Sequence, residues 1–397
     1  MMSKPKKYYS NQKIKETGAD IYIVYGQRSN GKSFSVKHEE AIKPYFNGGV
    51  EYISTYKNKE EVIAHEYKAG RRFIYLRRTE EELTAYEVEK YFDDVDIFHI
   101  TNGRYDGVKM YGRKVYFTKW NEEKGKSEKC DEYIAYCRSL ATEQNSAGGS
   151  YLDVYVIIFE EFMARGSGKG RQLNPYLYQE PDRLMNFFST IDRRRHVVKM
   201  WLLGNTISKV NPYLTEWGLQ KIRRQMKQGE VRSVWIGTGT FDEDGEEISV
   251  KVSIEWAENT GDSSYIIGNH KNMLNKGDWQ SDPQPHLPKS IKEYKKLYQI
   301  IFKYDDFMFK AWYIQDTETY DVAWFVYPYD GDIPERTIVV SKEIKPSPYW
   351  QRDPYNTKIK NDRLINLLQT FRESNVFYSD DECGTDFKQA IDFQIKK

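Results

Sequence analysis

The chain has 397 residues, with 60 Lys or Arg against 59 Asp or Glu, so its formal net charge is +1. A composition of 39% hydrophobic and 15% aromatic residues excludes a disordered or collagen-like chain, because both are poor in aromatic residues. The longest apolar run, Val154–Phe159, is far shorter than the roughly 20 residues of a membrane helix. The length favours about two to three domains, and any nucleic-acid role must depend on local placement of charge.

The cysteines and the amino end indicate the compartment. Cys130, Cys137 and Cys383 show no C-x-x-C spacing, and their odd number leaves one of them unpaired. The basic start has no apolar stretch behind it, so it does not match a signal peptide. We therefore expect a reduced, cytoplasmic protein without structural zinc and without membrane association.

Strand and helix patterns alternate in the first half of the chain. Apolar segments predict strands at Asp20–Tyr25, Phe73–Leu76, Val154–Phe159 and Val197–Leu203. Helical patterns lie at Lys32–Ala41 and Leu184–Thr190, and Thr79–Glu82 matches a capping box. The alternation requires crossover connections and predicts an α/β domain with a mainly parallel sheet flanked by helices.

The second half has a different pattern, in which hairpins are prominent. Two hairpins are predicted, one with strands Ser233–Thr238 and Ile248–Trp256, the other with strands Phe307–Ile314 and Tyr320–Tyr327. The capping box Ser290–Glu293 predicts the start of a helix, whose apolar positions are Ile291, Tyr294, Leu297 and Ile301. The same helical spacing recurs at Leu364, Leu367, Leu368 and Phe371. We expect one domain over residues 1–212, a basic linker over 213–245 and a smaller, strand-rich α+β domain over 246–397.

A phosphate-binding loop is predicted between the first strand and the first helix. The segment GQRSNGKS matches the pattern G-x-x-x-x-G-K-[ST], in which backbone N–H groups and the helix N-terminus surround phosphate oxygens. We expect Lys32 to reach the β- and γ-phosphates and the Ser33 hydroxyl to bind Mg²⁺. The predicted ATP and Mg²⁺ site comprises Gly26, Gln27, Arg28, Ser29, Asn30, Gly31, Lys32 and Ser33.

Two carboxylates follow the buried strand Val154–Phe159, at the end where open α/β sheets bind their ligands. We expect Glu160 to hold Mg²⁺, directly or through water, and Glu161 to act as general base on the attacking water. Asp is usual at the first position, so the longer Glu160 changes the reach to the metal. The alternative is a strand end with two solvated acids.

Polar and basic residues also surround the strand Val197–Leu203. Asn205 follows it and is a candidate for sensing the γ-phosphate or holding the lytic water, although Asn after a strand is also common turn chemistry. Arg193, Arg194 and Arg195 precede it at a predicted helix end. One of them could be an arginine finger for a neighbouring subunit, with Arg193 the first choice and Arg194 the second. The alternative is a solvated helix end stabilised by the helix dipole.

Two basic segments could contact nucleic-acid phosphates without reading bases. One lies on a glycine-rich loop after Glu161 and the other in the expected linker; their cations are Arg165, Lys169, Arg171, Lys221, Arg223 and Arg224. A run of charge is more often simply a solvated surface.

Other catalytic classes lack their signatures. The six histidines show no H-E-x-x-H or H-x-x-x-H spacing, and no G-x-S-x-G elbow is present. A two-metal nuclease could use Asp305, Asp306, Asp316 and Asp321, but these lie at predicted turns, where Asp is favoured for local hydrogen bonding.

Taken in order, these motifs resemble those of a known family. The loop Gly26–Ser33, the strand ending in two glutamates, the arginine-rich helix end and the segment LLGNTISKVNPYL are similar to the DNA-packaging ATPases (encapsidation proteins) of phi29-like short-tailed phages, small relatives of the large terminases. The resemblance covers about residues 15–215, and its most specific part is Asn205–Tyr213. The C-terminal half matches only in position and size.

The resemblance implies a terminase-like P-loop NTPase of the ASCE class that forms a ring, expected to be a pentamer, at the portal vertex and translocates double-stranded DNA into a procapsid. It places the Walker A motif at Gly26–Ser33, the Walker B motif at Val156–Glu160, the catalytic glutamate at Glu161 and the trans-acting arginine at Arg193. It also implies a C-terminal domain of RNase H-like fold, a vestigial nuclease without its catalytic acids. A terminase-like motor with an active nuclease and a non-translocating P-loop NTPase are the alternatives.

Overall fold

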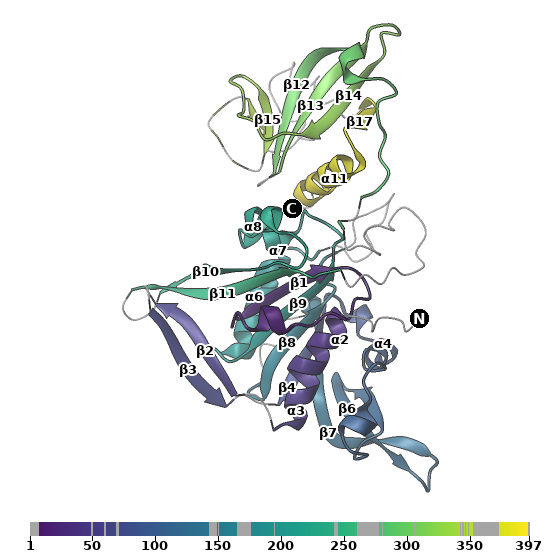
Figure 1. The fold of residues 1–397 in the computed structure, drawn as a ribbon, viewed down its shortest axis with the longest axis vertical. Helices are drawn as coiled ribbons and strands as arrows, with labels where there is room; N and C mark the ends of the chain where they lie inside the picture. The colour runs from purple at the N-terminus through teal and green to yellow at the C-terminus, as the bar shows by residue number, and fades with distance from the viewer. Residues whose placement is uncertain are drawn as a thin grey trace, which may run out of the picture. The chain divides into compact units, whose positions relative to one another are not determined.

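The computed structural model describes residues 8–395 with internal gaps. The gaps are residues 49–50, 59–60, 69–70, 143–148, 150, 165–175, 194, 242–244, 260–277, 280, 305–306, 342, 344, 346, 348 and 352–372. The chain divides into two compact units (Figure 1). Unit 1 comprises Met1–Ile207, Ile222–Ile266 and Met273–Asp278, and unit 2 comprises Ser208–Lys221, Ile267–Asn272 and Trp279–Lys397.

Unit 1 contains an eleven-stranded sheet whose centre is parallel. The parallel strands are, in spatial order, β11 (Glu247–Trp256), β1 (Ile21–Gly26), β9 (Lys199–Asn205), β8 (Val154–Glu160), β4 (Arg72–Arg77) and β7 (Lys126–Ser139). Every residue of β1 and β8 is buried, which explains their unbroken apolar sequences. The four strands predicted for the first half of the chain and the parallel character of this sheet are confirmed.

Antiparallel strands extend this sheet on both sides. They are β2 (Glu51–Asn58), β3 (Glu61–Lys68), β10 (Val231–Phe241), β5 (Gly107–Tyr111) and β6 (Lys114–Asn121). The hairpin of β10 and β11 was predicted, but its position was not: β11 pairs in parallel with β1, from Ile21 beside Val252 to Tyr25 beside Trp256. Residues 247–256, which we assigned to the C-terminal domain, therefore belong to the first sheet.

The helices of unit 1 are short. The helix after β1 begins as α2 (Lys32–Val36), continues as a π-helix, η1 (Lys37–Ile42), and ends as α3 (Lys43–Phe46). The others are α1 (Gln12–Lys15), η2 (Glu80–Glu82), α4 (Ala85–Lys90), α5 (Ile97–Ile100) and α6 (Glu180–Asp192). The predicted capping box is present, because Thr79 and Glu82 bond each other's backbone around η2. No helix in the described ranges is long and apolar enough to cross a membrane.

Unit 2 is built on a six-stranded mixed sheet. Its strands are, in spatial order, β16 (Trp350–Gln351), β15 (Ile338–Ser341), β12 (Tyr294–Tyr304), β13 (Phe307–Asp316), β14 (Val322–Pro328) and β17 (Val376–Tyr378). The antiparallel centre of β12, β13 and β14 confirms the second predicted hairpin. Helix α11 (Asp381–Ile395) packs Phe387 and Ala390 into the core of this sheet.

One predicted helix of unit 2 is a strand. The capping box at Ser290 and Glu293 forms, but it closes only the 3-10 turn η4 (Ile291–Glu293), and Tyr294–Tyr304 is β12. Ile300, Phe302 and Tyr304 enter the core at every second residue, and β13 pairs along the whole strand. Pairing and burial override the helical spacing of the apolar residues. The other predicted helix, around Leu364–Phe371, lies outside the described residues.

Candidate functional site

The predicted phosphate-binding loop connects the buried strand β1 to α2. Gly31 is the N-cap of α2 with a φ of 93°, and Ser29 has a φ of 59°, so the loop depends on left-handed backbone that glycine adopts without strain. A side chain at Gly26 would be crowded, since an added Cβ would lie 3.0 Å from the Cβ of Ala257. The sequence therefore supplies glycine at two positions where the geometry favours it, whereas Ser29 adopts a left-handed backbone with a side chain.

Lys32 is folded back onto this loop. Its ammonium group donates to the carbonyl of Gln27 at 2.5 Å and to Oδ1 of Asn30 at 3.0 Å, and its side chain is buried. Burial lowers the pKa of Lys32 to about 7, and the nearby Glu160 only partly opposes this. A polyphosphate in the loop would add negative charge beside this buried side chain and favour its protonated form.

Ser33 and Glu160 meet at the end of β8. The Ser33 Oγ donates to Oε2 of Glu160 at 2.9 Å, and burial raises the pKa of the Glu160 carboxyl. A hydroxyl beside a buried carboxylate is the hard oxygen donor set that Mg²⁺ prefers. The two predicted metal residues thus lie together, and the longer Glu160 reaches the loop.

Glu161 has a partner that the sequence did not reveal. Its backbone is left-handed, with a φ of 57°, and its Oε2 accepts from Arg77 Nη2 at 3.0 Å at the end of the neighbouring strand β4. Arg78 donates to the backbone oxygens of Glu161 and Phe162 and pairs with the buried Glu180. Two consecutive arginines, the last residue of β4 and the one after it, therefore fix the segment that carries Glu161. Arg77 precedes Glu161 by more than eighty positions, so no local pattern pointed to it.

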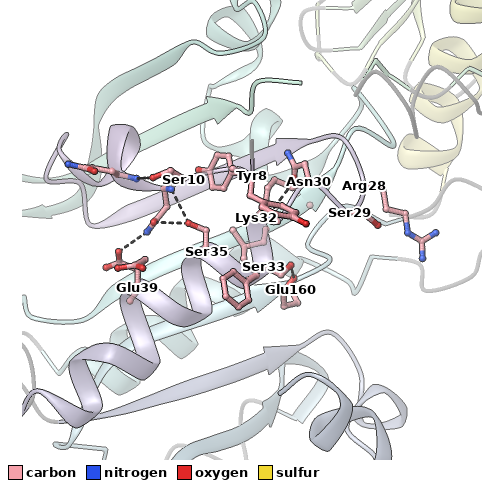
Figure 2. Close-up of a pocket in the computed structure, with 18 of the residues that line it drawn as sticks. Tyr8, Ser10, Arg28, Ser29, Asn30, Lys32, Ser33, Ser35, Glu39 and Glu160 are labelled. Carbon is pink, nitrogen blue, oxygen red and sulfur yellow. Dashed lines mark hydrogen bonds between the residues drawn. The ribbon is translucent and has the colours of Figure 1, made fainter. Parts of the chain in front are cut away.

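A pocket of about 1320 Å³ lies over the loop and includes Lys32, Ser33, Glu160 and Glu161 among its lining residues. Asn205 also lines it, as it pairs with Gly26 in the register of β9 and β1. Figure 2 shows Lys32 and Ser33 near Glu160, whereas Arg28 extends away from them. The predicted carboxylates, loop and Asn205 are thus brought to one edge of the sheet.

The amino-terminal segment forms a wall of the pocket that sequence reasoning missed. Tyr9 N donates to the Asn30 carbonyl at 3.0 Å, and the Tyr9 hydroxyl donates to Oε2 of Glu255 at 2.6 Å. Asn11 exchanges hydrogen bonds with Ser35 in α2. Burial raises the pKa of Glu255 to about 7, which favours its protonated form beside Tyr9. The short motif Tyr8–Gln12 carries no signature, and only the fold shows that it contacts the loop.

Arg193 and Arg195, which follow α6, lie at the opposite edge of the sheet. Arg193 is exposed and donates to the Gly149 carbonyl at 2.6 Å, while Arg195 donates to the carbonyls of Leu152 and Val154 at the amino end of β8. Arg194 lies outside the described residues. Since Glu160 is at the carboxyl end of β8, these arginines are not brought to the loop of their own chain.

The basic residues expected to contact phosphates differ in exposure. Lys221 and Arg224 are exposed on α8 (Gln220–Gln225), but Arg223 is only 6% exposed, which argues against its predicted role at a surface. Arg165, Lys169 and Arg171 lie outside the described residues.

Asp316 and Asp321, two of the four aspartates considered as nuclease ligands, form hydrogen bonds within a turn. Asp316 Oδ1 accepts from the backbone N–H groups of Glu318 and Thr319, and Asp321 accepts from the Thr319 hydroxyl. Asp305 and Asp306 fall in a gap of the description. Within the ranges that are described, we find no group of three or more His, Cys, Asp or Glu that could hold a metal ion.

Comparison with known proteins supports the resemblance deduced from the motifs. Residues 38–226 match the family model described as Podovirus DNA encapsidation protein (Gp16), which confirms the predicted relationship over this part of the chain. The chain is 26% identical over 219 residues to the DNA packaging protein of Bacillus phage phi29, covering 53% of this chain and 50% of that protein. For the DNA packaging protein of Bacillus phage B103, identity is 27% over 165 residues, covering 42% and 44%. The chain spans about half the length of the curated relatives it matches.

Solved structures of packaging motors also align with the chain. The bacteriophage Phi-29 viral genome packaging motor assembly aligns with 19% identity and a TM-score of 0.47, covering 96% of this chain and 99% of that one. The N-terminal domain of the phi29 packaging ATPase aligns with 23% identity and a TM-score of 0.41, covering 65% and 99%.

Proposed function

We propose that this chain is the ATPase of a viral DNA-packaging motor, which hydrolyses ATP in unit 1 and translocates double-stranded DNA into a procapsid. The observation that carries the proposal is the convergence of the loop Gly26–Ser33 with Glu160 and Glu161 at one edge of a parallel sheet. The match of residues 38–226 to the encapsidation family supports DNA as the substrate of the motor.

Each residue of the site has a role that follows from its chemistry. Lys32 and the loop N–H groups bind the β- and γ-phosphates, and Ser33 and Glu160 hold Mg²⁺, which neutralises charge on those phosphates when bound. Glu161 orients and deprotonates the attacking water, and Asn205 lies where it can contact the γ-phosphate or that water. The tyrosine-bearing wall Tyr8–Gln12 extends the pocket beyond the loop, as the nucleoside part of ATP requires.

The placement of Arg193 supports hydrolysis between subunits. Arg193 lies near the amino end of β8, whereas the loop is at the carboxyl end, so any catalytic role for Arg193 would be at the site of a neighbouring subunit. A finger that acts in trans requires a neighbouring subunit, and the resemblance to the packaging ATPases implies that the subunits form a ring, expected to be a pentamer on the portal vertex. ATP at the subunit edge would hold neighbours together, and hydrolysis would release them.

For unit 2, we propose a non-catalytic domain with an RNase H-like fold. Its mixed sheet supports that assignment, as does the use of Asp316 and Asp321 in a turn. An active nuclease is the competing possibility, and nicking of plasmid DNA by the full chain with Mn²⁺ would establish it.

The decisive experiment measures the ATPase rate of the full chain with and without double-stranded DNA and empty procapsids. We expect DNA and procapsids to stimulate the wild type, and Lys32→Ala and Glu161→Gln each to abolish turnover. Lys109→Ala and Glu122→Gln, which change exposed residues outside the pocket, are the matched controls and should retain the wild-type rate.

Two results would contradict the proposal. If Lys32→Ala or Glu161→Gln still hydrolysed ATP, the assignment of that residue to the ATP site would be wrong. Wild-type hydrolysis that does not respond to DNA and procapsids would instead favour a non-translocating P-loop NTPase.

A further inference from the structure

We propose that Tyr91 is a positioning residue for the metal-binding carboxylate, with its hydroxyl holding one oxygen of Glu160 so that the other faces Ser33 and Mg²⁺. This inference rests on the proposed function of the site. Tyr91 follows α4, in a segment between two strands of the sheet, and no motif of the sequence marks it.

The two oxygens of Glu160 have different partners. Oε1 lies 3.4 Å from the Tyr91 hydroxyl, and Oε2 accepts from Ser33 Oγ at 2.9 Å. A carboxylate can only accept, and a neutral phenol beside it must donate, so the polarity of the Tyr91 contact is fixed. The carboxylate is thereby oriented with Oε2 toward the phosphate loop.

Two side chains contact the ring of Tyr91. One face stacks on Tyr75 of β4, with ring centroids 4.3 Å apart and an angle of 26° between planes. The ammonium group of Lys37 lies 4.3 Å from the ring centroid and also donates to the Tyr91 carbonyl and to Asp94. Lys37 begins the π-helix η1, one turn after the phosphate loop, so the ring is coupled to the loop through the same helix.

The geometry also accounts for glutamate where aspartate is usual. Glu160 has one more methylene group than aspartate and therefore one more rotatable bond, which must be fixed before Oε2 can serve as a ligand. A hydroxyl that holds Oε1 restricts that bond. Residues that orient metal ligands in this way typically change metal affinity about 10- to 100-fold when they are removed.

The test compares Tyr91→Phe with the wild type in binding of a fluorescent methylanthraniloyl ATP to the full chain during a Mg²⁺ titration. Phenylalanine keeps the stack on Tyr75 and removes only the hydroxyl. Because the contact is long, we expect the Mg²⁺ concentration for half-maximal binding to rise by about tenfold, the lower end of that range. Binding in EDTA and the thermal midpoint should stay at wild-type values.

Tyr155→Phe is the matched control. The Tyr155 hydroxyl is buried and donates to the Ala41 carbonyl at 2.8 Å, so this variant also loses a tyrosine hydrogen bond near the same helix without losing a contact to Glu160. Its Mg²⁺ dependence should be unchanged. A Tyr91→Phe curve that coincides with the wild type, or an equal loss of binding in EDTA, would overturn the inference.

A second variant keeps the inference testable if Tyr91→Phe does not fold. Lys37→Met removes the ammonium group that contacts the Tyr91 ring and carbonyl. It should therefore also raise the Mg²⁺ concentration for half-maximal binding. Direct repulsion of Mg²⁺ alone would have the opposite sign, because removing a cation near the site favours Mg²⁺. Lys37 also partly offsets the rise that burial causes in the pKa of Glu160, so the titration is run at pH 8 and pH 9, and only a rise that is equal at both pH values counts as positioning. A lowered or unchanged Mg²⁺ requirement therefore counts against positioning. Wild-type protein without Mg²⁺-dependent binding would instead contradict the proposed ATP site, which separates the two failures.

Discussion

The ammonium group of Lys32 donates to the Gln27 carbonyl at 2.5 Å, so the cation that should bind phosphate is held by its own loop. Its pKa of about 7 leaves it largely neutral in the nucleotide-free protein above that pH. A polyphosphate favours the charged form, so binding of ATP should take up a proton when the pH exceeds 7. Since the complex then carries more protons than the free protein, affinity should fall as pH rises.

Calorimetry in buffers of different ionisation enthalpy measures this uptake. At pH 8.5 we expect uptake of about one proton per ATP bound, because the free ammonium is mostly deprotonated there. Lys32→Arg is the control, as a guanidinium keeps its charge and should bind without uptake. Equal proton uptake in the wild type and in Lys32→Arg would assign the proton to another group.

Arg78 and Glu180 form a buried ion pair next to the segment that carries Glu161, with Nε to Oε2 at 2.9 Å and side-chain exposures of 2% and 0%. Arg78→Met removes the cation that pairs with the buried Glu180 carboxylate, so we expect a loss of about 3–5 kcal/mol in the free energy of unfolding. Urea denaturation of the full chain measures it. Adding Glu180→Gln should recover much of the loss, since the amide needs no counter-charge; a double variant no more stable than Arg78→Met would contradict this account.

Substitution of Arg193 should affect catalysis, whereas substitution of Arg195 should affect stability. Arg193→Ala should fold normally and bind ATP, yet lower the ATPase rate of the assembled ring by about 10³-fold or more. Mixing it with Glu161→Gln subunits should restore activity, because some interfaces then combine an intact Glu161 with a neighbour's intact Arg193. Arg195→Ala should instead lower stability, as Arg195 bonds several backbone carbonyls. Wild-type turnover in Arg193→Ala rings would place the finger elsewhere.

The cations of α8 should differ in their effect on DNA binding. If Lys221 and Arg224 contact phosphates, the double change to Ala should reduce the slope of log affinity against log salt by about 2, roughly one per lost contact, for any DNA sequence. Arg223→Ala is the comparison, since this side chain is buried and its loss should affect stability and leave the slope unchanged. Filter binding of a double-stranded oligonucleotide over a range of KCl concentrations measures both slopes. A slope that changes only in Arg223→Ala would reverse this assignment.

The parts of the fold that the sequence could predict are those whose signal is local. β1, β4, β8 and β9 have apolar runs because both faces of a parallel sheet are covered, and the loop Gly26–Ser33 is a contiguous motif. The outer strands β5 and β6 mix lysine, tyrosine and glycine, since they are only partly buried, and that composition gave no strand pattern. In β12 a local signal was misleading. Its apolar residues have helical spacing by chance, but pairing with β13 makes the segment a strand.

The residues of the candidate site also differ in whether a local sequence signal marks them. The candidate residues Lys32, Ser33, Glu160 and Glu161 stand in short motifs, so the sequence alone could point to them. Their partners come from distant parts of the chain: Arg77 from the end of β4, Tyr91 from after α4, and Tyr9 from the amino-terminal segment. Such contacts depend on which strands become neighbours, and one sequence contains no direct record of that.

The interleaving of the two units has a mechanical consequence. Among the described residues the chain passes between units at least twice, between Ile207 and Ser208 just after β9 and between Lys221 and Ile222 within α8. The first passage leaves from β9, and the second leads into the hairpin of β10 and β11; β9 and β11 are the two strands that flank β1. A torque on unit 2 therefore cannot be relieved by free rotation about a single linker. Unit 2 is instead joined through the chain to β9 and β11, the two neighbours of the strand that leads into the loop Gly26–Ser33.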